Sequence, residues 1–228
     1  MIVDRAGVGA DIFGFTFRSW DVPAFAIKPL TASPQTLDAL AGLLVETVAA
    51  GGSVHFMHPL SHAEARGFWE KALAAAARGE RVVFGAYDGA TLISTVSLLL
   101  VTPPNQPHRA EIGKMMTHPQ HRGRGAAKAL LAEAERLAAE RGRTLINLDT
   151  AADEGGAPLY EKMGYVFAGS IPDFAFRPHG GLTATKIYWK RLGRDTRRCD
   201  VDAPVGRVRT RPTAASTRPQ GGEGNHSP

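Results

Sequence analysis

The sequence predicts a mixed α/β domain built on one mostly antiparallel sheet. Segments with strand character and segments with helical periodicity follow one another between residues 24 and 191. Three consecutive strands are expected with no helix between them, and Asp88-Gly89 is a strong hairpin turn between the first two. Strands joined by a hairpin are antiparallel. The chain has 228 residues, 43% of them apolar, so it can bury a substantial core.

The first helix is expected soon after a strand at 24–30. Ser33 and Pro34 suit the N-cap and the first helical position. One apolar stripe follows at spacings of three and four residues, formed by Leu37, Leu40, Leu44 and Val48. Two glycines at 51–52 end this helix. A second helix is predicted for about 61–78, opened by the capping-box pattern Ser-His-Ala-Glu.

The remaining elements follow from the same kinds of pattern. The predicted strands are 81–87, 91–101, 111–117, 144–149, 166–171 and 183–191. The predicted helices run from after Gly123 to about residue 140, and from 157 to 163. The resulting order is β-αα-βββ-α-β-α-ββ, with about seven strands and about four helices.

The domain is expected to span 23–193, between an N-terminal extension (1–22) and a C-terminal tail (194–228). We interpret the extension as a loosely attached segment. The alternative is a short edge strand through the alternating Phe13, Phe15 and Phe17. The tail is rich in Pro, Gly, Arg, Ser and Thr and has no apolar periodicity, which predicts disorder.

Charge is concentrated in the tail, which contains seven arginines and four acidic residues, a net +3 of the +5 of the whole chain. The body is therefore nearly neutral, and a nucleic-acid partner is not favoured. No signal peptide is recognised, and no apolar run approaches the roughly 20 residues of a membrane span. The single cysteine, Cys199, excludes an intramolecular disulfide. We expect a cytoplasmic protein with no membrane partner.

Residues 111–131 combine a strand, a basic glycine turn and the start of a helix. His118-Pro119 closes the strand. The turn is Gln120-His121-Arg122-Gly123-Arg124-Gly125, and apolar residues then recur at helical spacing. A helix start leaves four N–H groups unpaired and has partial positive charge, and glycines let a ligand approach the backbone. This stretch predicts a binding site for a phosphate or pyrophosphate.

Three other interpretations are weaker. The histidines His55, His58 and His62 resemble a metal cluster, but Pro59 interrupts any helix that would align them, so no metal is expected. The segment also resembles a dinucleotide-binding unit, but Lys128 stands where the third glycine would be needed. A GxSxG nucleophile elbow is absent, and Cys199 lies outside the domain, so a covalent acyl-enzyme is not expected.

Two motifs in sequence order resemble the GNAT acyltransferase superfamily. The first is Gln120-x-x-Gly123-x-Gly125, overlapped by Arg122-x-x-Gly125-x-Ala127. The second is Leu159-Tyr160-Glu161-Lys162-Met163-Gly164-Tyr165. The resemblance covers roughly residues 25–192. It implies the GNAT fold, acetyl-CoA as co-substrate bound through its pyrophosphate at the first motif, and transfer of the acetyl group to an amine.

Within the superfamily the chain looks closest to the tabtoxin-resistance type of acetyltransferase. The similar segments are LVETVAAGGSVHFM, RAEIGKMM, LINLDTAADEGGAPLY and TATKIYWKRLG. The resemblance implies an amino-acid-like bacterial toxin as acceptor and a role in toxin or antibiotic resistance. It does not extend to the first 22 residues or the tail, and residues 153–156 replace an asparagine that many relatives have there.

Acetyl transfer to an amine requires removal of a proton from the ammonium and protonation of the departing thiolate. Tyr160 is our candidate acid, because a phenol with a pKa near 10 matches a thiol with a pKa near 8.5. Glu111 and Asp149 lie at predicted strand ends, where α/β sheets bind ligands. They are candidate bases, or alternatively they bind the positive charge of the acceptor. For each of the three, an ordinary structural role is the alternative.

The predicted cofactor contacts lie in one segment: Met115, Met116, Thr117, Gln120, His121, Arg122, Gly123, Arg124, Gly125, Ala126, Ala127 and Lys128. The resemblance implies that the backbone of 115–117 pairs with the pantetheine arm. The acceptor pocket is expected between the two N-terminal helices, Glu111 and the last two strands, with Asp173, Phe174 and Phe176 along it. The expected partners are acetyl-CoA and a small amine, and a homodimer remains open. A polyamine, amino-acid or protein acceptor, or a non-catalytic acyl-CoA-binding module, is the alternative function.

Overall fold

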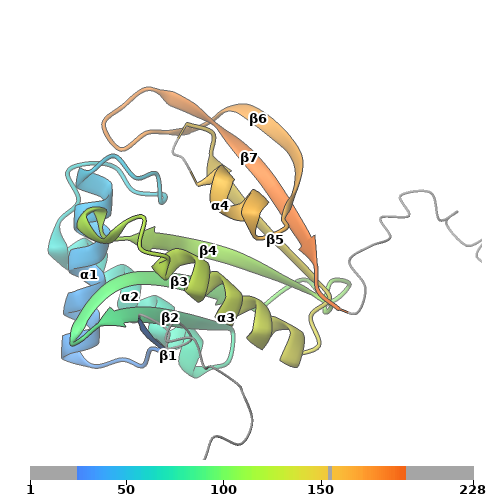
Figure 1. Cartoon of the computed structure of the whole chain (residues 1–228). Coiled ribbons are helices and arrows are strands. Elements are labelled where there is room, and N and C mark those ends of the chain that lie inside the picture. Colours follow the sequence, from blue (N-terminus) through green and yellow to red (C-terminus); the bar gives the residue numbers. More distant parts are fainter. Residues whose placement is uncertain (1–24, 154–155, 194–228) are drawn as a thin grey trace, which may run out of the picture. The chain divides into compact units, whose positions relative to one another are not determined.

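The computed structural model describes residues 25–153 and 156–193, which form a seven-stranded sheet with helices on both faces (Figure 1). The strands are β1 (Ala26–Pro29), β2 (Arg81–Asp88), β3 (Thr91–Leu99), β4 (Arg109–Thr117), β5 (Leu145–Ala151), β6 (Val166–Phe176) and β7 (Leu182–Arg191). The helices are α1 (Pro34–Ala49), α2 (His62–Ala77), α3 (Ala126–Glu140) and α4 (Ala157–Lys162), with a 3-10 turn η1 (Pro119–His121). The predicted fold class and order of elements are confirmed. The predicted loosely attached extension, with its alternative of a strand through Phe13, Phe15 and Phe17, and the predicted disordered tail with Cys199 lie outside the described residues.

The sheet has the strand order β1-β2-β3-β4-β5-β7-β6. Every neighbouring pair is antiparallel except β4 and β5, which are parallel. This exception follows from the chain path, because α3 carries the chain from the end of β4 back to the start of β5. The parallel pair is also short, since its register extends only from Arg109 opposite Leu145 to Glu111 opposite Asn147. Beyond these residues β4 and β5 are no longer paired, and the sheet opens between them.

A bulge in β4 lies beside this opening. Thr95 is opposite Met116, whereas Ser97 is opposite Gly113, so β4 contains one residue more than β3 over the same length. Lys114 lies within the inserted stretch and has a φ of +52°, in the left-handed region. A lysine rarely adopts this conformation, because its Cβ crowds the backbone there. The bulge therefore turns this part of β4 away from regular pairing with β3.

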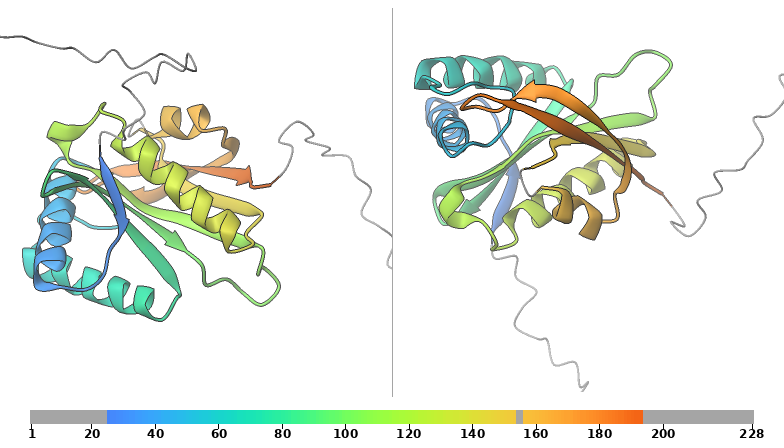
Figure 2. Two further views of the ribbon diagram at one scale, coloured as in Figure 1. Left: turned by 60° about the horizontal axis from the view of Figure 1, so that its bottom comes forward. Right: turned by 90° about the horizontal axis from the view of Figure 1, so that it is seen from above.

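The two faces of the sheet have separate cores (Figure 2). On one face α3 packs its apolar side against β2, β3 and β4, with Leu130, Leu131, Ala134 and Ala138 fully buried. On the other face α1 and α2 pack against the same strands, with Leu40, Leu44, Val48 and Trp69 fully buried. Because α1 and α2 cover only the β2–β4 half, the β5–β7 half of that face lacks a covering helix. None of the described helices is long and apolar enough to span a membrane.

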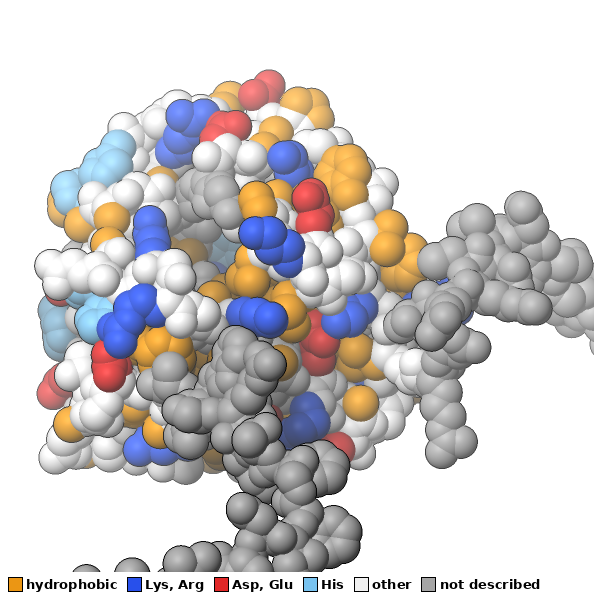
Figure 3. Space-filling view, in the orientation of Figure 1, with side chains coloured by type: hydrophobic (Ala, Val, Ile, Leu, Met, Phe, Trp, Pro, Cys, Tyr) orange, Lys and Arg blue, Asp and Glu red, His pale blue; other side chains and the backbone are white. Residues whose placement is uncertain are grey.

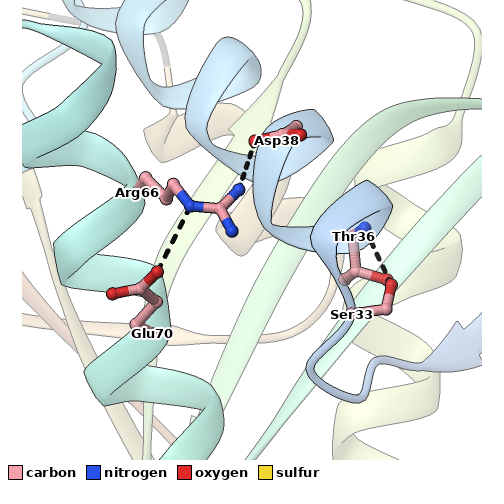
Figure 4. Close-up of polar contacts among 5 residues, drawn as sticks. All are labelled: Ser33, Thr36, Asp38, Arg66 and Glu70. Atoms are coloured by element: carbon pink, nitrogen blue, oxygen red, sulfur yellow. Dashed lines mark hydrogen bonds and ion pairs between the residues drawn. The ribbon is translucent and has the colours of Figure 1, made fainter.

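Local interactions fix α1 and α2 as a pair (Figure 4). Ser33 caps α1 by accepting a hydrogen bond from the N–H of Thr36 at 3.1 Å. Arg66 of α2 pairs with Asp38 of α1 and also, at 3.2 Å, with Glu70 one turn further along α2. The capping box predicted at the start of α2 is present. The α1–α2 pair thus supports the segment that follows α1, and this segment lines the cleft described below.

Several strand ends differ from the sequence-based expectation by one or two residues, and one strand is longer by five. The predicted strand 166–171 continues to Phe176, because a register shift between Ile171 and Ala175 absorbs Pro172 and lets pairing with β7 resume. Proline lacks an N–H donor and is tolerated on an edge strand such as β6. The predicted strand 111–117 begins two residues earlier, at Arg109, where β4 pairs with β5.

Candidate active site

A cleft of about 1070 Å³ occupies the opening between β4 and β5. It reaches from the glycine turn before α3, past α4, to the segment after α1 and the ends of β6 and β7. In the space-filling view, lysine and arginine side chains lie around a hollow on this face, mixed with apolar and acidic side chains (Figure 3). All the sequence-predicted site residues line this cleft except Gln120 and Arg124.

The glycine turn presents unpaired backbone donors to the cleft. Gly125 is the N-cap of α3 and offers no side chain to the first turn, whose N–H groups at 126–128 have no helical acceptor. Gly123 and Gly125 both have left-handed φ angles, +77° and +92°, which glycine adopts without strain. The free N–H groups and the helix dipole suit a phosphate oxygen.

Basic side chains add formal charge beside this turn. Arg122, Lys128 and Lys162 line the cleft there, and none of them forms an ion pair within the described residues. Arg124 points elsewhere, since it pairs with Asp88 at 2.8 Å and contacts His121 at 2.8 Å. Gln120 is exposed outside the cleft. The structure thus separates two of the predicted contacts from the rest of the set.

Tyr160, on α4, is 5% exposed and lines the cleft. Its hydroxyl makes no hydrogen bond with the described residues. Burial, and then the negative charge of Asp149, raise the pKa of Tyr160 to about 12. The phenol therefore keeps its proton at neutral pH and is free to donate it. Its neighbours differ, since the Tyr188 hydroxyl donates to Glu161 at 3.0 Å and the Tyr165 hydroxyl is buried outside the cleft.

The two predicted carboxylates line the same cleft, from the two diverging strands. Glu111 lies 3.6 Å from Arg109, whose guanidinium also donates to Asn147 at 2.7 Å. Asp149 accepts a hydrogen bond from the Thr185 hydroxyl at 3.1 Å. Each carboxylate thus has one polar partner on the sheet and remaining oxygen lone pairs for a ligand.

Sequence reasoning did not assign Lys114 or His55 to the acceptor pocket, where the two side chains are in direct contact. The Lys114 Nζ lies 2.9 Å from the His55 Nδ1. Burial lowers the pKa of Lys114 to about 8, with Asp149 opposing the shift and Arg81 adding to it. Burial and the Lys114 charge also lower the pKa of His55. Both residues have left-handed φ angles, as does Asp173, and such strain clusters at functional sites.

No sequence pattern predicts the contact between Lys114 and His55, because 59 positions separate them. The bulge in β4 could not be foreseen either, because its residue with a left-handed φ angle is Lys114 and not a glycine. The hairpin between β6 and β7 borders the same end of the cleft. Its tip docks onto the segment after α1, where the His58 N–H donates to the Pro178 carbonyl at 2.9 Å. Phe174 lines the cleft, whereas Asp173 and Phe176, expected with it, do not. Asp153 joins this hairpin through Arg177 and Thr183.

The histidines considered as a metal cluster are used in other ways. His55 contacts Lys114, and the His58 ring packs against the His179 ring in a tilted arrangement, with 4.5 Å between the ring centroids. Within residues 25–153 and 156–193, no group of three or more His, Cys, Asp or Glu side chains is arranged to hold a metal ion.

The sheet is antiparallel except for one parallel pair, and it opens at that pair, where a helix begins. Comparison with known sequences points to the acetyltransferases as the class of protein. Residues 54–165 match the sequence model of the Acetyltransferase (GNAT) family. This match, over just under half of the chain, identifies the GNAT acetyltransferase family as its relatives, and it supports an enzyme of the acyltransferase class.

Solved structures share the fold at low sequence identity. An N-acetyltransferase from Staphylococcus aureus Mu50 has 16% identity and a TM-score of 0.62, over 74% of this chain and 99% of that one. A ribosomal-protein-alanine N-acetyltransferase from Brucella melitensis has 20% identity and a TM-score of 0.62, over 73% and 99%. A phosphinothricin acetyltransferase from Sinorhizobium meliloti, solved with acetyl-CoA, has 19% identity and a TM-score of 0.64, over 76% and 91%.

Proposed function

We propose that the protein transfers the acetyl group of acetyl-CoA to a primary amine of a small molecule, by direct attack within a ternary complex. The observation that carries the proposal is that one cleft contains both a site suited to phosphate and a group of side chains suited to proton transfer. Unpaired N–H groups and cations gather at the start of α3, and a phenol and two carboxylates lie along the diverging strands. The S. meliloti neighbour was solved with acetyl-CoA, which supports acetyl-CoA as the co-substrate.

In this proposal the glycine turn binds the pyrophosphate of acetyl-CoA, and the stretch of β4 at 115–117, which is not paired with β5, pairs with the pantetheine arm. The acceptor amine attacks the thioester carbonyl carbon, a C–N bond forms, and the C–S bond breaks. Tyr160 donates its proton to the departing thiolate, and the ammonium proton leaves to Asp149, Glu111 or a water that one of them holds. Tyr160 holds its proton at neutral pH, but burial raises its pKa to about 12 and so makes it a weaker acid than the free phenol considered from the sequence.

Direct transfer is tested by steady-state kinetics on the full chain. We expect double-reciprocal plots to intersect, and Cys199→Ser to keep full activity, because no acyl-cysteine intermediate is required. Parallel lines would instead indicate an acyl-enzyme. The simpler first test measures thiol release from acetyl-CoA across a panel of primary amines. Tight binding of CoA without turnover on any amine would count against the proposal.

We further propose an amino-acid-like toxin or antibiotic as the natural acceptor, and hence a role in resistance. The resemblance to the tabtoxin-resistance type supports this choice. A polyamine acceptor is less suitable, because Arg81 and Lys114 place two cations on the acceptor side of the cleft. Mass spectrometry of such a toxin incubated with the protein and acetyl-CoA should detect the mono-acetylated product. Its absence would remove the resistance role and leave the acetyltransferase proposal in place.

A further inference from the structure

The acceptor side of the cleft contains buried polar atoms that no protein group satisfies. The Nε of Arg81 and the Oγ of Ser97 are both buried without a hydrogen-bond partner, and both residues line the cleft. Ser97 is completely buried. The Arg81 guanidinium forms no ion pair or side-chain hydrogen bond within the part of the chain that the structure describes. Such groups cost free energy unless a ligand or water completes them.

The strand register places these two groups beside each other and on the face that carries Glu111. Arg81 of β2 is opposite Leu99 of β3, which is opposite Glu111 of β4. One step along, Ser97 is opposite Gly113, which has no side chain to cover the serine hydroxyl. A Cβ at this glycine would meet the Leu99 side chain at 3.3 Å. The bare backbone of β4 therefore keeps this corner of the cleft open.

Lys114 brings a second cation to the same corner. Its Nζ lies 5.9 Å and 5.5 Å from the ring centroids of Phe56 and Phe68, and 2.9 Å from the His55 ring nitrogen. None of these neighbours is an acid. Asp149 attracts this ammonium without forming an ion pair, and Arg81 repels it. Two cations thus share a partly buried site with no carboxylate in contact with either.

We propose that Arg81, Ser97 and Lys114 form a subsite for a carboxylate of the acceptor, so that the substrate is a zwitterionic, amino-acid-like amine. A carboxylate would offset the repulsion between the two cations and accept hydrogen bonds from the guanidinium and the serine hydroxyl. Glu111 and Asp149, which line the same cleft, would take the ammonium end. This inference rests on the proposed acetyltransferase function. It states that Arg81, Ser97 and Lys114 determine which acceptor is bound.

The first experiment compares acceptors that differ only by the carboxylate. The pairs are L-leucine with isopentylamine, L-phenylalanine with 2-phenylethylamine, and L-lysine with cadaverine, each assayed by thiol release with the full chain. For the amino acid of an accepted pair we expect kcat/KM at least about tenfold above that of its decarboxylated partner. Arg81→Gln should bring the ratio close to one by lowering only the amino-acid value. Ser97→Ala should lower the same ratio by about threefold.

The matched control is Arg136→Gln on α3, which removes an arginine paired with Glu133 and Glu140 outside the cleft. It should leave the ratio unchanged. A wild-type ratio near one would overturn the subsite while leaving acetyl transfer intact. An equal loss on both members of each pair in Arg81→Gln would also overturn it, because that pattern indicates a structural role.

A second readout does not depend on turnover. Succinate, used as a dicarboxylate probe without acetyl-CoA, should raise the Tm of the wild type and of Arg136→Gln but not that of Arg81→Gln. If no amine is acetylated but succinate behaves in this way, the subsite stands and the proposed function fails. If succinate stabilises Arg81→Gln as much as the wild type, or stabilises neither, the subsite is wrong.

Discussion

The two ends of the cleft are built in different ways. The end at the glycine turn comes from one continuous segment, in which the end of β4, η1 and the start of α3 follow each other directly. The acceptor end is assembled from β2, β3, β4, β5, the segment after α1 and the β6–β7 hairpin. The first end consists mostly of backbone donors, whereas the second consists of side chains that repel or attract one another across the sheet.

This difference explains what each end can tolerate. Backbone N–H groups at a helix start are retained under most substitutions, provided that the glycines keep their left-handed conformations. Side chains on several elements depend on the β4 bulge and on the closeness of distant strands. The acceptor end is therefore the part of this cleft that single substitutions change most easily, in keeping with a function that depends on the site and not on the fold.

The largest expected effect falls on the residue between the two ends. Tyr160→Phe removes the proposed acid while keeping the ring, and should lower kcat by about 100-fold with little change in the KM for acetyl-CoA. The matched control is Tyr165→Phe, because the Tyr165 ring centroid lies 5.9 Å from that of Tyr160 and its buried hydroxyl does not line the cleft. That control should keep kcat within about threefold. Equal losses in both variants would indicate a role in packing instead of proton transfer.

The second prediction isolates the turn end. Gly125→Ala forces a Cβ onto a residue with a φ of +92° at the start of α3, and should raise the KM for acetyl-CoA by about 30-fold, since the strain and the shifted N–H groups act together. Gly142→Ala imposes similar strain at the other end of the same helix, at a φ of +71°. Both variants should lose about 1 kcal/mol of stability. If Gly142→Ala raises the KM equally, the effect comes from the whole helix and not from the turn.

The turn end could be predicted from the sequence because it is local. Its glycines, arginines and helix start lie within a few residues, so pattern reasoning found them together. The directions of Gln120 and Arg124 could not be foreseen. Arg124 forms an ion pair with Asp88, which lies at the end of β2 and is distant in sequence. The fold was predicted for a similar reason, since periodicity and turn residues act over short stretches.

The acceptor end could be predicted only in part. Glu111 and Asp149 were chosen as strand-end residues, but β4 begins at Arg109 and β5 runs to Ala151, so both lie inside strands, close to where the pairing of β4 with β5 stops. Arg81 and Ser97 were not predicted, because their importance lies in the absence of a partner, which only packing reveals. Lys114 was missed because a regular strand would alternate its side chains, and the bulge breaks that alternation.

The third prediction tests the carboxylates of the acceptor end. Asp149→Asn should lower kcat/KM for the amine by about tenfold and leave the KM for acetyl-CoA unchanged. The variant also removes a negative charge that helps to raise the pKa of Tyr160. Glu111→Gln should act less strongly, because Arg109 already pairs with this carboxylate. If both variants keep the wild-type pH–rate profile, neither carboxylate is the base and a water chain must accept the proton.

The smallest expected effect is on stability, and it follows from the charge that the acceptor end buries. Burial lowers the pKa of Lys114 from 10.5 to about 8. Below pH 8 this lysine is charged in both the folded and the unfolded chain, so the folded state carries the full penalty of the buried charge. Between pH 8 and 10.5 the unfolded lysine keeps a proton that the folded one has lost, so the free energy of unfolding rises with pH.

Lys114→Met removes this penalty and keeps the length of the side chain. We therefore expect the variant to be more stable than the wild type by about 1–2 kcal/mol at pH 7. This gain should disappear as the pH approaches the pKa of a free lysine. Urea unfolding at pH 7 and pH 10 measures both values, and Lys71→Met, at an exposed position on α2, is the control without a pH-dependent difference. A loss of stability at pH 7 would mean that the contacts of Lys114 with His55 and the phenylalanine rings outweigh its burial. A gain would show that the acceptor end maintains this cation at the expense of stability, as expected for a charge retained for binding and not for folding.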